Sequence, residues 1–256
     1  MLVDARLFAG GLRDGDLETL LDFGVRRCVV APLLRPRARD EHAWLEAFDA
    51  LFEREIPRLQ KFGFDARAMV GVHGRSMPEE RWRLVVGRLP RYLGHRACVA
   101  LGSLGLHKGT RAELELLREQ LALAADLHRP VVVTAFGRTG LPASLRLLLE
   151  LRKHGPTPAR VLVDGLARTL VPSALAMGFH VGLTVHPDVL TAEDATATIR
   201  SLGPTRLLVE TAAGRGASNL LGLARTEHLL EKSGLPRAVV DRTCGDTAAR
   251  FFGISD

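Results

Sequence analysis

Residues that could bind an anion follow several short apolar segments of this chain. Arg6, His73 with Arg75, and His186 each stand at the end of such a segment. Guanidinium groups bind carboxylates and phosphates through charge-assisted hydrogen bonds, and histidine can contribute to the same kind of site. We therefore predict a pocket for a small anionic ligand, with a partner protein as the other possible occupant. Its candidate residues are Arg6, His73, Arg75, Ser103, His107, Thr134, Arg138, Asp164, His186 and Glu210.

The same residue types leave a metal site open as an alternative. Zinc and magnesium need three or four nitrogen, oxygen or sulfur ligands, and a single-metal site could be built from His73, His107, Asp164 and His186. The three cysteines are too few and too scattered for a Cys-x-x-Cys zinc site or a disulfide framework. No serine stands in a Gly-x-Ser-x-Gly turn, so a hydrolase triad has no support.

Several of these residues also have a purely structural interpretation. Asp164 could serve only to neutralise Arg6, because two buried charges are tolerated when they are paired. His73 could be a packing residue at a strand end. Glu210 could stabilise the turn after the last strand, and Asp4 could be a structural hydrogen-bond acceptor. These alternatives stay open at the level of the sequence.

Buried strands and amphipathic helices must position these residues, and they alternate along the whole chain. Nearly continuous Val, Leu and Ala segments are typical of strands buried on both faces of a parallel sheet, and an apolar period of three to four indicates helices. The predicted strands are Met1–Ala5, Val25–Pro32, Ala66–Val72, Ala97–Leu101, Pro130–Thr134, Arg160–Asp164, His180–Thr184 and Arg206–Glu210. The predicted helices are Asp16–Phe23, Glu41–Phe62, Arg81–Leu93, Ala112–Leu127, Ala143–Leu151 and Ala192–Leu202. Pro57 makes the second of these either two helices or one kinked helix.

Eight such alternations over 256 residues predict a (β/α)8 TIM barrel, an α/β fold for which about 250 residues is typical. We expect one domain, residues 1–256, in which Leu220–Asp256 forms two closing helices. Functional groups of such barrels lie at the carboxyl ends of the strands. That rule is the reason for choosing the candidate residues above.

Composition narrows the classes of partner. The chain has 35 Lys+Arg against 29 Asp+Glu, a formal net charge of +6. This balance permits a nucleic-acid partner, but aromatic residues make up only 5% and offer few stacking platforms. We see no apolar run of the ~18 residues that a membrane span needs and no signal peptide, so we expect a cytoplasmic protein without a membrane partner.

The strand ends, taken in order, resemble the TatD family of metal-dependent hydrolases, within the amidohydrolase-like barrels. The segments that carry the resemblance are Val3-Asp-Ala-Arg-Leu-Phe-Ala9, Gly102-Ser-Leu-Gly-Leu106, Leu207-Leu-Val-Glu-Thr-Ala-Ala213 and Thr247-Ala-Ala-Arg-Phe-Phe-Gly253. Gly71-Val-His-Gly-Arg-Ser-Met-Pro78 is closest to a TatD-related branch. The resemblance covers the whole chain and implies a barrel with a metal-dependent hydrolase ancestry.

The positions that match the family's metal ligands hold other residues. The two histidines of the first strand are replaced by Arg6 and Phe8, the bridging glutamate by Ser103, the histidine after the fifth strand by Thr134 and the aspartate after the eighth by Ala212. After the sixth strand the nearby carboxylate is Asp164. We therefore expect no metal cofactor and a degenerate site.

Three functions remain at this stage. The favoured one is a pseudoenzyme that binds a small anion or a partner protein. The second is an active phosphoesterase or nuclease with a remodelled zinc or magnesium site. The third is a nucleic-acid-binding module that does not cleave. Basic residues in the predicted loops support an anionic partner in each case: Arg35, Arg37, Arg39, Arg75, Lys108, Arg138, Arg168 and Arg215.

Overall fold

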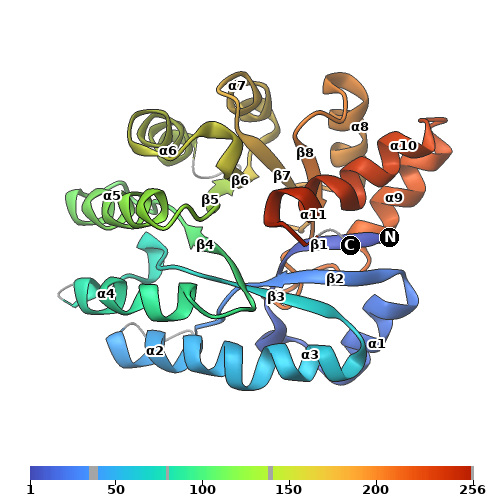
Figure 1. The fold of residues 1–256 in the computed structure, drawn as a ribbon. Helices are drawn as coiled ribbons and strands as arrows, with labels where there is room; N and C mark the ends of the chain where they lie inside the picture. Colours follow the sequence, from blue (N-terminus) through green and yellow to red (C-terminus); the bar gives the residue numbers. More distant parts are fainter. Residues whose placement is uncertain (35–39, 79–80, 138–140, 255–256) are drawn as a thin grey trace.

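Eight parallel strands form one sheet in the computed structural model, which describes residues 1–34, 40–78, 81–137 and 141–254. The order of strands in the sheet follows the chain from β1 to β8 (Figure 1). The strands are β1 Leu2–Leu7, β2 Val25–Val30, β3 Asp65–Val70, β4 Cys98–Leu104, β5 Val131–Gly137, β6 Val161–Leu166, β7 His180–Thr184 and β8 Leu207–Glu210. All seven ladders are parallel, which requires a crossover connection after each strand.

Helices surround the sheet on its outer side, with the last helix of the chain across one end of the barrel (Figure 1). They are α1 Asp14–Asp22, α2 Glu41–Ala50, α3 Ile56–Phe62, α4 Trp82–Leu93, α5 Arg111–Asp126, α6 Leu141–His154, α7 Val171–Ala176, α8 Ala192–Leu202, α9 Gly222–Lys232, α10 Arg237–Asp241 and α11 Thr247–Phe252. Among the residues that the structure describes, no helix combines the length and apolarity that would carry it across a membrane.

The sheet closes where β1 meets β8. Phe8 N–H donates to the carbonyl of Ala213 at 2.8 Å, and Leu7 pairs with Ala213 in an isolated parallel bridge. The buried carboxylate of Asp4 strengthens this seam, since it accepts hydrogen bonds from both the hydroxyl and the N–H of Thr211. The (β/α)8 barrel prediction is confirmed.

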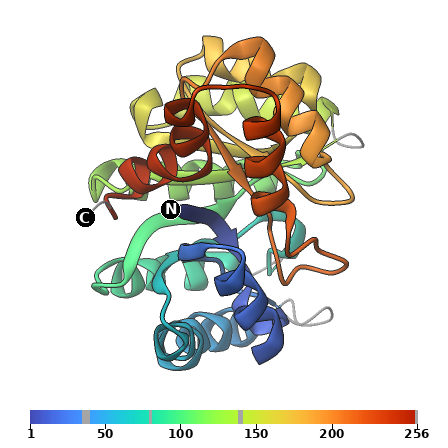
Figure 2. The same ribbon diagram turned by 90° about the vertical axis from the view of Figure 1, so that its right-hand side faces the viewer.

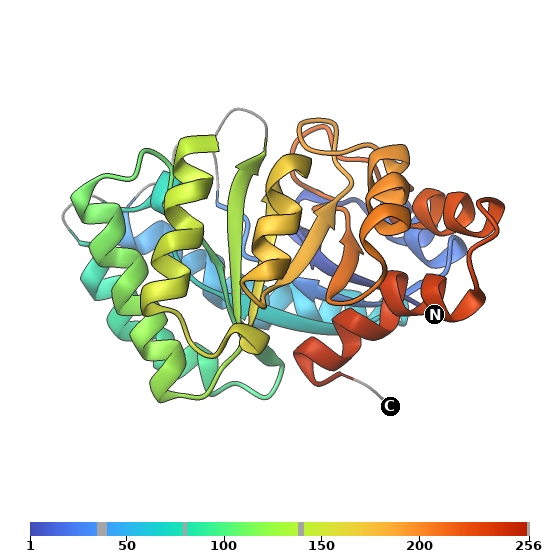
Figure 3. The same ribbon diagram turned by 90° about the horizontal axis from the view of Figure 1, so that it is seen from above.

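The interior of the barrel is filled from its amino-terminal end. Val3, Met69 and Leu162 belong to one buried cluster with Ala248 and Phe252 of α11. Figure 3 shows α11 at the end of the barrel opposite the tip of β5, and Figure 2 shows the N-terminus beside the C-terminal helices. One end is therefore plugged by apolar side chains, and the other end, at the carboxyl ends of the strands, is left for polar ones.

The helical segment predicted at Glu41–Phe62 is continuous. A π-helical turn, Leu51–Glu55, joins α2 to α3 just before Pro57, whose missing N–H cannot complete the regular α-helical hydrogen bonds. Gly63 ends the segment in a left-handed conformation, with φ of 99°. The closing segment is similar, because α10 and α11 are joined by a π-helical turn, Arg242–Asp246.

Four strands run further than the sequence predicts. β1, β4, β5 and β6 extend to Leu7, Leu104, Gly137 and Leu166, past the expected ends at residues 5, 101, 134 and 164. Each extension contains a register shift against its neighbouring strand. Such irregularities let polar side chains enter a strand next to a site. Arg6 and Ser103 consequently lie within strands and not after them.

Candidate functional site

A buried guanidinium occupies the centre of the barrel mouth. Arg6 of β1 is 2% exposed, and its two terminal nitrogens lie 2.8 Å from the carboxylates of Asp164 on β6 and Glu210 on β8. The hydroxyls of Thr134 and Thr184 also accept from it, at 2.8 and 3.4 Å. Four strands, β5 to β8, therefore place polar groups around the one side chain that β1 supplies. The pair of Arg6 and Asp164, which the sequence analysis left open as one alternative, is present, and Glu210 is a second partner that the sequence analysis did not assign to Arg6.

The charges in this cluster do not balance if every group is ionised. Burial raises the pKa of Glu210 to about 8, although Arg6 acts against this shift. Burial also raises the pKa of Asp164, while the carboxylates outweigh burial and raise the pKa of Arg6. One guanidinium between two carboxyl groups is neutral when one carboxyl carries a proton. We therefore assign that proton to Glu210 near neutral pH.

Three atoms of the cluster keep unused hydrogen-bonding capacity. Within the described part of the chain, Arg6 Nε, Asp164 Oδ2 and Glu210 Oε2 are buried and have no hydrogen-bond partner. An unsatisfied buried polar atom costs free energy. The cluster is therefore less favourable for the free energy of folding than a well-packed apolar core would be.

Two histidines fix the backbone on opposite sides of the mouth. His73 Nδ1 accepts from the N–H of Arg75 at 3.0 Å, so its Nε2–H donates to the carbonyl of Thr134 at 3.3 Å. His186 Nδ1 accepts from the N–H of Asp188 at 3.2 Å, so its Nε2–H donates to the carbonyl of Arg215 at 3.1 Å. Both imidazoles thus brace one backbone segment against another. Burial lowers the pKa of His73 to about 4, and the charge of Arg215 adds to that effect.

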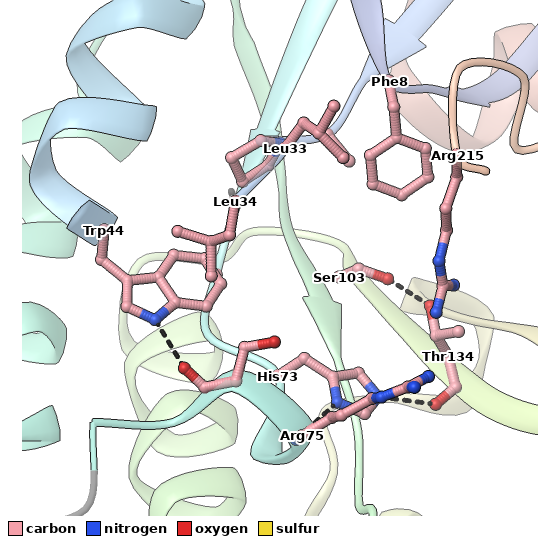
Figure 4. Close-up of a pocket in the computed structure, with 13 residues that line it drawn as sticks. Phe8, Leu33, Leu34, Trp44, His73, Arg75, Ser103, Thr134 and Arg215 are labelled. Atoms are coloured by element: carbon pink, nitrogen blue, oxygen red, sulfur yellow. Dashed lines mark hydrogen bonds between the residues drawn. The ribbon is translucent and has the colours of Figure 1, made fainter. Parts of the chain in front are cut away.

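The two braced segments carry Arg75 and Arg215, which face the same space. Both side chains line each of two neighbouring cavities, of about 170 and about 460 Å³, together with Thr134. Figure 4 shows the two guanidinium groups on the same side of the smaller cavity. Burial lowers the pKa of Arg215, and the positive charges of Arg6 and Arg75 lower it further. Positive charge is therefore concentrated at the mouth.

The buried carboxylate of Glu113 holds the loop after β4. The Glu113 carboxylate accepts from the N–H groups of His107, Lys108 and Gly109. Burial opposes its ionisation, but these amides outweigh burial and lower its pKa. Glu113 is three residues after Thr110, a spacing that indicates a capping box. Only the Thr110 half of the box forms, since Thr110 Oγ1 accepts from the N–H of Glu113 at 3.3 Å.

Comparisons with known proteins add to this geometry. No protein-family model matches the chain. Over 238 residues the chain is 26% identical to an uncharacterized metal-dependent hydrolase of Methanocaldococcus jannaschii, a match that covers 93% of this chain and 94% of that protein. The solved structure of a TatD-like protein from Archaeoglobus fulgidus superposes with a TM-score of 0.83 at 22% identity, covering 98% of this chain and 99% of the other. The chain has a TatD-like fold.

A more distant structure shares the same barrel. The β-aspartyl dipeptidase of Fervidobacterium islandicum, solved with a β-Asp-Leu dipeptide, superposes with a TM-score of 0.69 at 12% identity. That match covers 98% of this chain and 75% of the dipeptidase. The TatD-like barrel described here therefore follows the core of a larger hydrolase, and the likeness concerns the fold alone.

The residues of this TatD-like barrel do not fit a metal centre. Phe8 and Ala212 offer no donor atom, and the carboxylates of Asp164 and Glu210 are bound to the guanidinium of Arg6. A dication beside that fixed positive charge would be repelled. Across residues 1–34, 40–78, 81–137 and 141–254, no group of three or more His, Cys, Asp or Glu side chains lies together as a metal would need. The single-metal alternative from His73, His107, Asp164 and His186 thus has no assembled ligand set.

The other candidate residues of the TatD-like barrel fall into two groups. Ser103 and Thr134 line the smaller cavity, where their hydroxyls are hydrogen-bonded to each other. His107 lies in the loop held by Glu113 and lines neither of the two cavities. Arg138 lies outside the described residues, as do Arg35, Arg37 and Arg39. The apolar wall formed by Phe8, Leu33, Leu34 and Trp44 was not anticipated, because its residues come from three separate places, the segment after β1, the segment after β2 and α2.

Proposed function

We propose that this TatD-like barrel is a pseudoenzyme that has exchanged metal chemistry for ligand binding at the barrel mouth. The observation that carries the proposal is the position of Arg6, whose guanidinium is bound to Asp164 and Glu210 at 2.8 Å. A permanent internal cation neutralises the carboxylates that would otherwise attract a metal ion. We further propose a cytoplasmic location, with no membrane partner.

The groups at the mouth support binding better than catalysis. A general base must accept a proton near neutral pH, yet both nitrogens of His73 and of His186 are engaged with backbone atoms. Ser103 shares its hydrogen bond with the hydroxyl of Thr134 and not with a base. No nucleophile–base pair is therefore arranged for hydrolysis among these residues.

A small anion is the ligand class that the charges favour. Arg75 and Arg215 line the same cavities while Arg6 already has two carboxyl partners. The carboxylate of Asp188 also lines the larger cavity, but it is 89% exposed and water weakens its effect. An anion between the two arginines would gain charge-assisted hydrogen bonds. We keep a partner protein that presents an acidic side chain as the second form of this proposal.

Two measurements on the purified protein test the proposal. Hydrolysis of bis(4-nitrophenyl) phosphate and of DNA, with zinc or magnesium added, should not exceed the protein-free blank. Calorimetric titration with acetate and with inorganic phosphate should detect binding of at least one of them. Arg215→Met should abolish that binding, whereas Arg200→Met, on the exposed surface of α8, should leave it unchanged.

The contrary outcomes are distinct. Turnover that requires metal and disappears with a chelator would establish the active-hydrolase alternative. Binding of DNA with a steep salt dependence and no cleavage would establish the nucleic-acid-binding alternative, because contacts to several phosphates release counterions.

A further inference from the structure

The smaller cavity at the mouth has two chemically different walls. Phe8, Leu33, Leu34 and Trp44 form one side, and Arg75, Arg215, Ser103 and Thr134 form the other (Figure 4). The indole of Trp44 is fixed, since its N–H donates to the carbonyl of Ser76 at 2.9 Å. The apolar wall is therefore a built surface and not a chance exposure.

The guanidinium groups stand at the boundary between this cavity and the larger one. Arg75, Arg215 and Thr134 line both spaces. The segment that carries each arginine is braced by a histidine, His73 or His186. In the part of the chain that the structure describes, the Arg215 guanidinium makes no ion pair, and burial together with the neighbouring positive charges lowers its pKa. The side chain that faces the cavity is thus ready for an external anion.

The volume sets the size of the apolar part. The cavity of about 170 Å³ is close to the roughly 150 Å³ of an apolar cavity that accepts benzene. It is well below the roughly 300–1,000 Å³ of pockets for drug-sized molecules. One six-membered ring or a branched chain of similar size fits, and a nucleoside does not.

We infer that this cavity binds a small amphipathic carboxylate. Its carboxylate lies between Arg75 and Arg215, and its ring-sized apolar body lies against the wall of Phe8, Leu33, Leu34 and Trp44. A monoanionic carboxylate suits the site better than a phosphate dianion, because half of the wall is apolar and stripping water from a second charge is costly. The planar fork of arginine matches a carboxylate in two hydrogen bonds. This inference rests on the proposed function, since it specifies the anion that the mouth binds.

Isothermal titration calorimetry with four probes tests the inference. Benzoate carries both parts, acetate carries the head group, benzyl alcohol carries the ring, and phenyl phosphate replaces the carboxylate. Each buried methylene strengthens binding about fourfold, so benzoate should bind at least tenfold more tightly than acetate. Benzyl alcohol and phenyl phosphate should both bind more weakly than benzoate.

Two variants separate the walls. Arg215→Met should weaken benzoate binding by at least tenfold, with Arg200→Met as the matched control. Leu33→Ser should weaken the binding of benzoate severalfold and leave the binding of acetate unchanged. The Leu33 side chain is 38% exposed, so the fold tolerates this change. Leu149→Ser, at an exposed leucine of α6 that lines neither cavity, is its control. Thermal melting checks that each variant is folded.

The outcomes distinguish this inference from the proposed function. If benzoate binds no more tightly than acetate, and Arg215→Met weakens the binding of both, the inference of an apolar subsite is wrong and the proposed anion site stands. If benzyl alcohol binds as tightly as benzoate, or phenyl phosphate binds more tightly than benzoate, the assignment of a carboxylate ligand is overturned. If no anion binds at all, the proposed function itself fails.

Discussion

Replacing Arg6 with methionine should destabilise the protein in a way that depends on pH. The substitution keeps much of the apolar volume but leaves Asp164 and Glu210 buried without their cation. A carboxylate in that position must be protonated. Because Glu210 already has a raised pKa of about 8, the new cost arises chiefly from Asp164.

The size of the effect follows from the ordinary pKa of an aspartate. Holding Asp164 protonated at pH 7, when its unfolded value is 3.8, costs about 4 kcal/mol at roughly 1.4 kcal/mol per pH unit. At pH 5 the same step costs about 2 kcal/mol. In the variant the pKa of Asp164 is higher in the folded protein than in the unfolded chain. The free energy of unfolding therefore falls as the pH rises above the pKa of the unfolded chain. A loss of about 4 kcal/mol lowers the melting temperature of a chain of this size by roughly 8–16 °C.

Urea unfolding of the native protein and of Arg6→Met, at pH 5 and at pH 7, measures this difference. The double variant Arg6→Met with Asp164→Asn should recover most of the loss at pH 7, because the buried charge is gone. An equal loss at both pH values, or a loss at pH 7 below about 1 kcal/mol, would show that Arg6 is not held by a buried ionised carboxylate.

Two further outcomes follow from the same groups. The free energy of unfolding should fall as the pH rises from about 4.5 to about 8, because Glu210 ionises near 4.5 in the unfolded chain but stays protonated in the folded protein up to a pKa of about 8. Glu210→Gln should flatten this slope in urea unfolding, and an unchanged slope would refute the assignment of the proton. Gly105→Ala should lower the melting temperature and abolish the binding of acetate and benzoate. A Cβ at its φ of 155° would lie 2.4 Å from His73 Nε2 and 2.4 Å from the carbonyl oxygen of Thr134. If the variant melts and binds like the native protein, the His73 brace is dispensable.

Sequence periodicity predicted the barrel because buried parallel strands and amphipathic helices differ in their apolar spacing. The strand-end rule placed Arg6 and Asp164 at the same end of the barrel but left open whether they pair. The second partner, Glu210, could not be assigned, because the shear of the closed barrel decides which strand ends face one another.

The roles of His73 and His186 depend on local backbone geometry. Each Nδ1 accepts from the N–H two residues later, and each Nε2 reaches a carbonyl on another segment. The sequence shows a histidine near an arginine in one case and 29 residues away from it in the other, so no spacing rule identifies the pair. Trp44 joins the mouth only because α2 folds over it, which sequence position alone does not reveal.

The central claim is that the guanidinium of Arg6 stands where metal chemistry would otherwise occur. Elemental analysis of the purified protein after equilibration with zinc and dialysis tests it most directly, with Arg6→His as the comparison. The account predicts far less than one zinc per chain in the native protein. One tightly held zinc per chain, lost when Asp164 is changed to Asn, would contradict it.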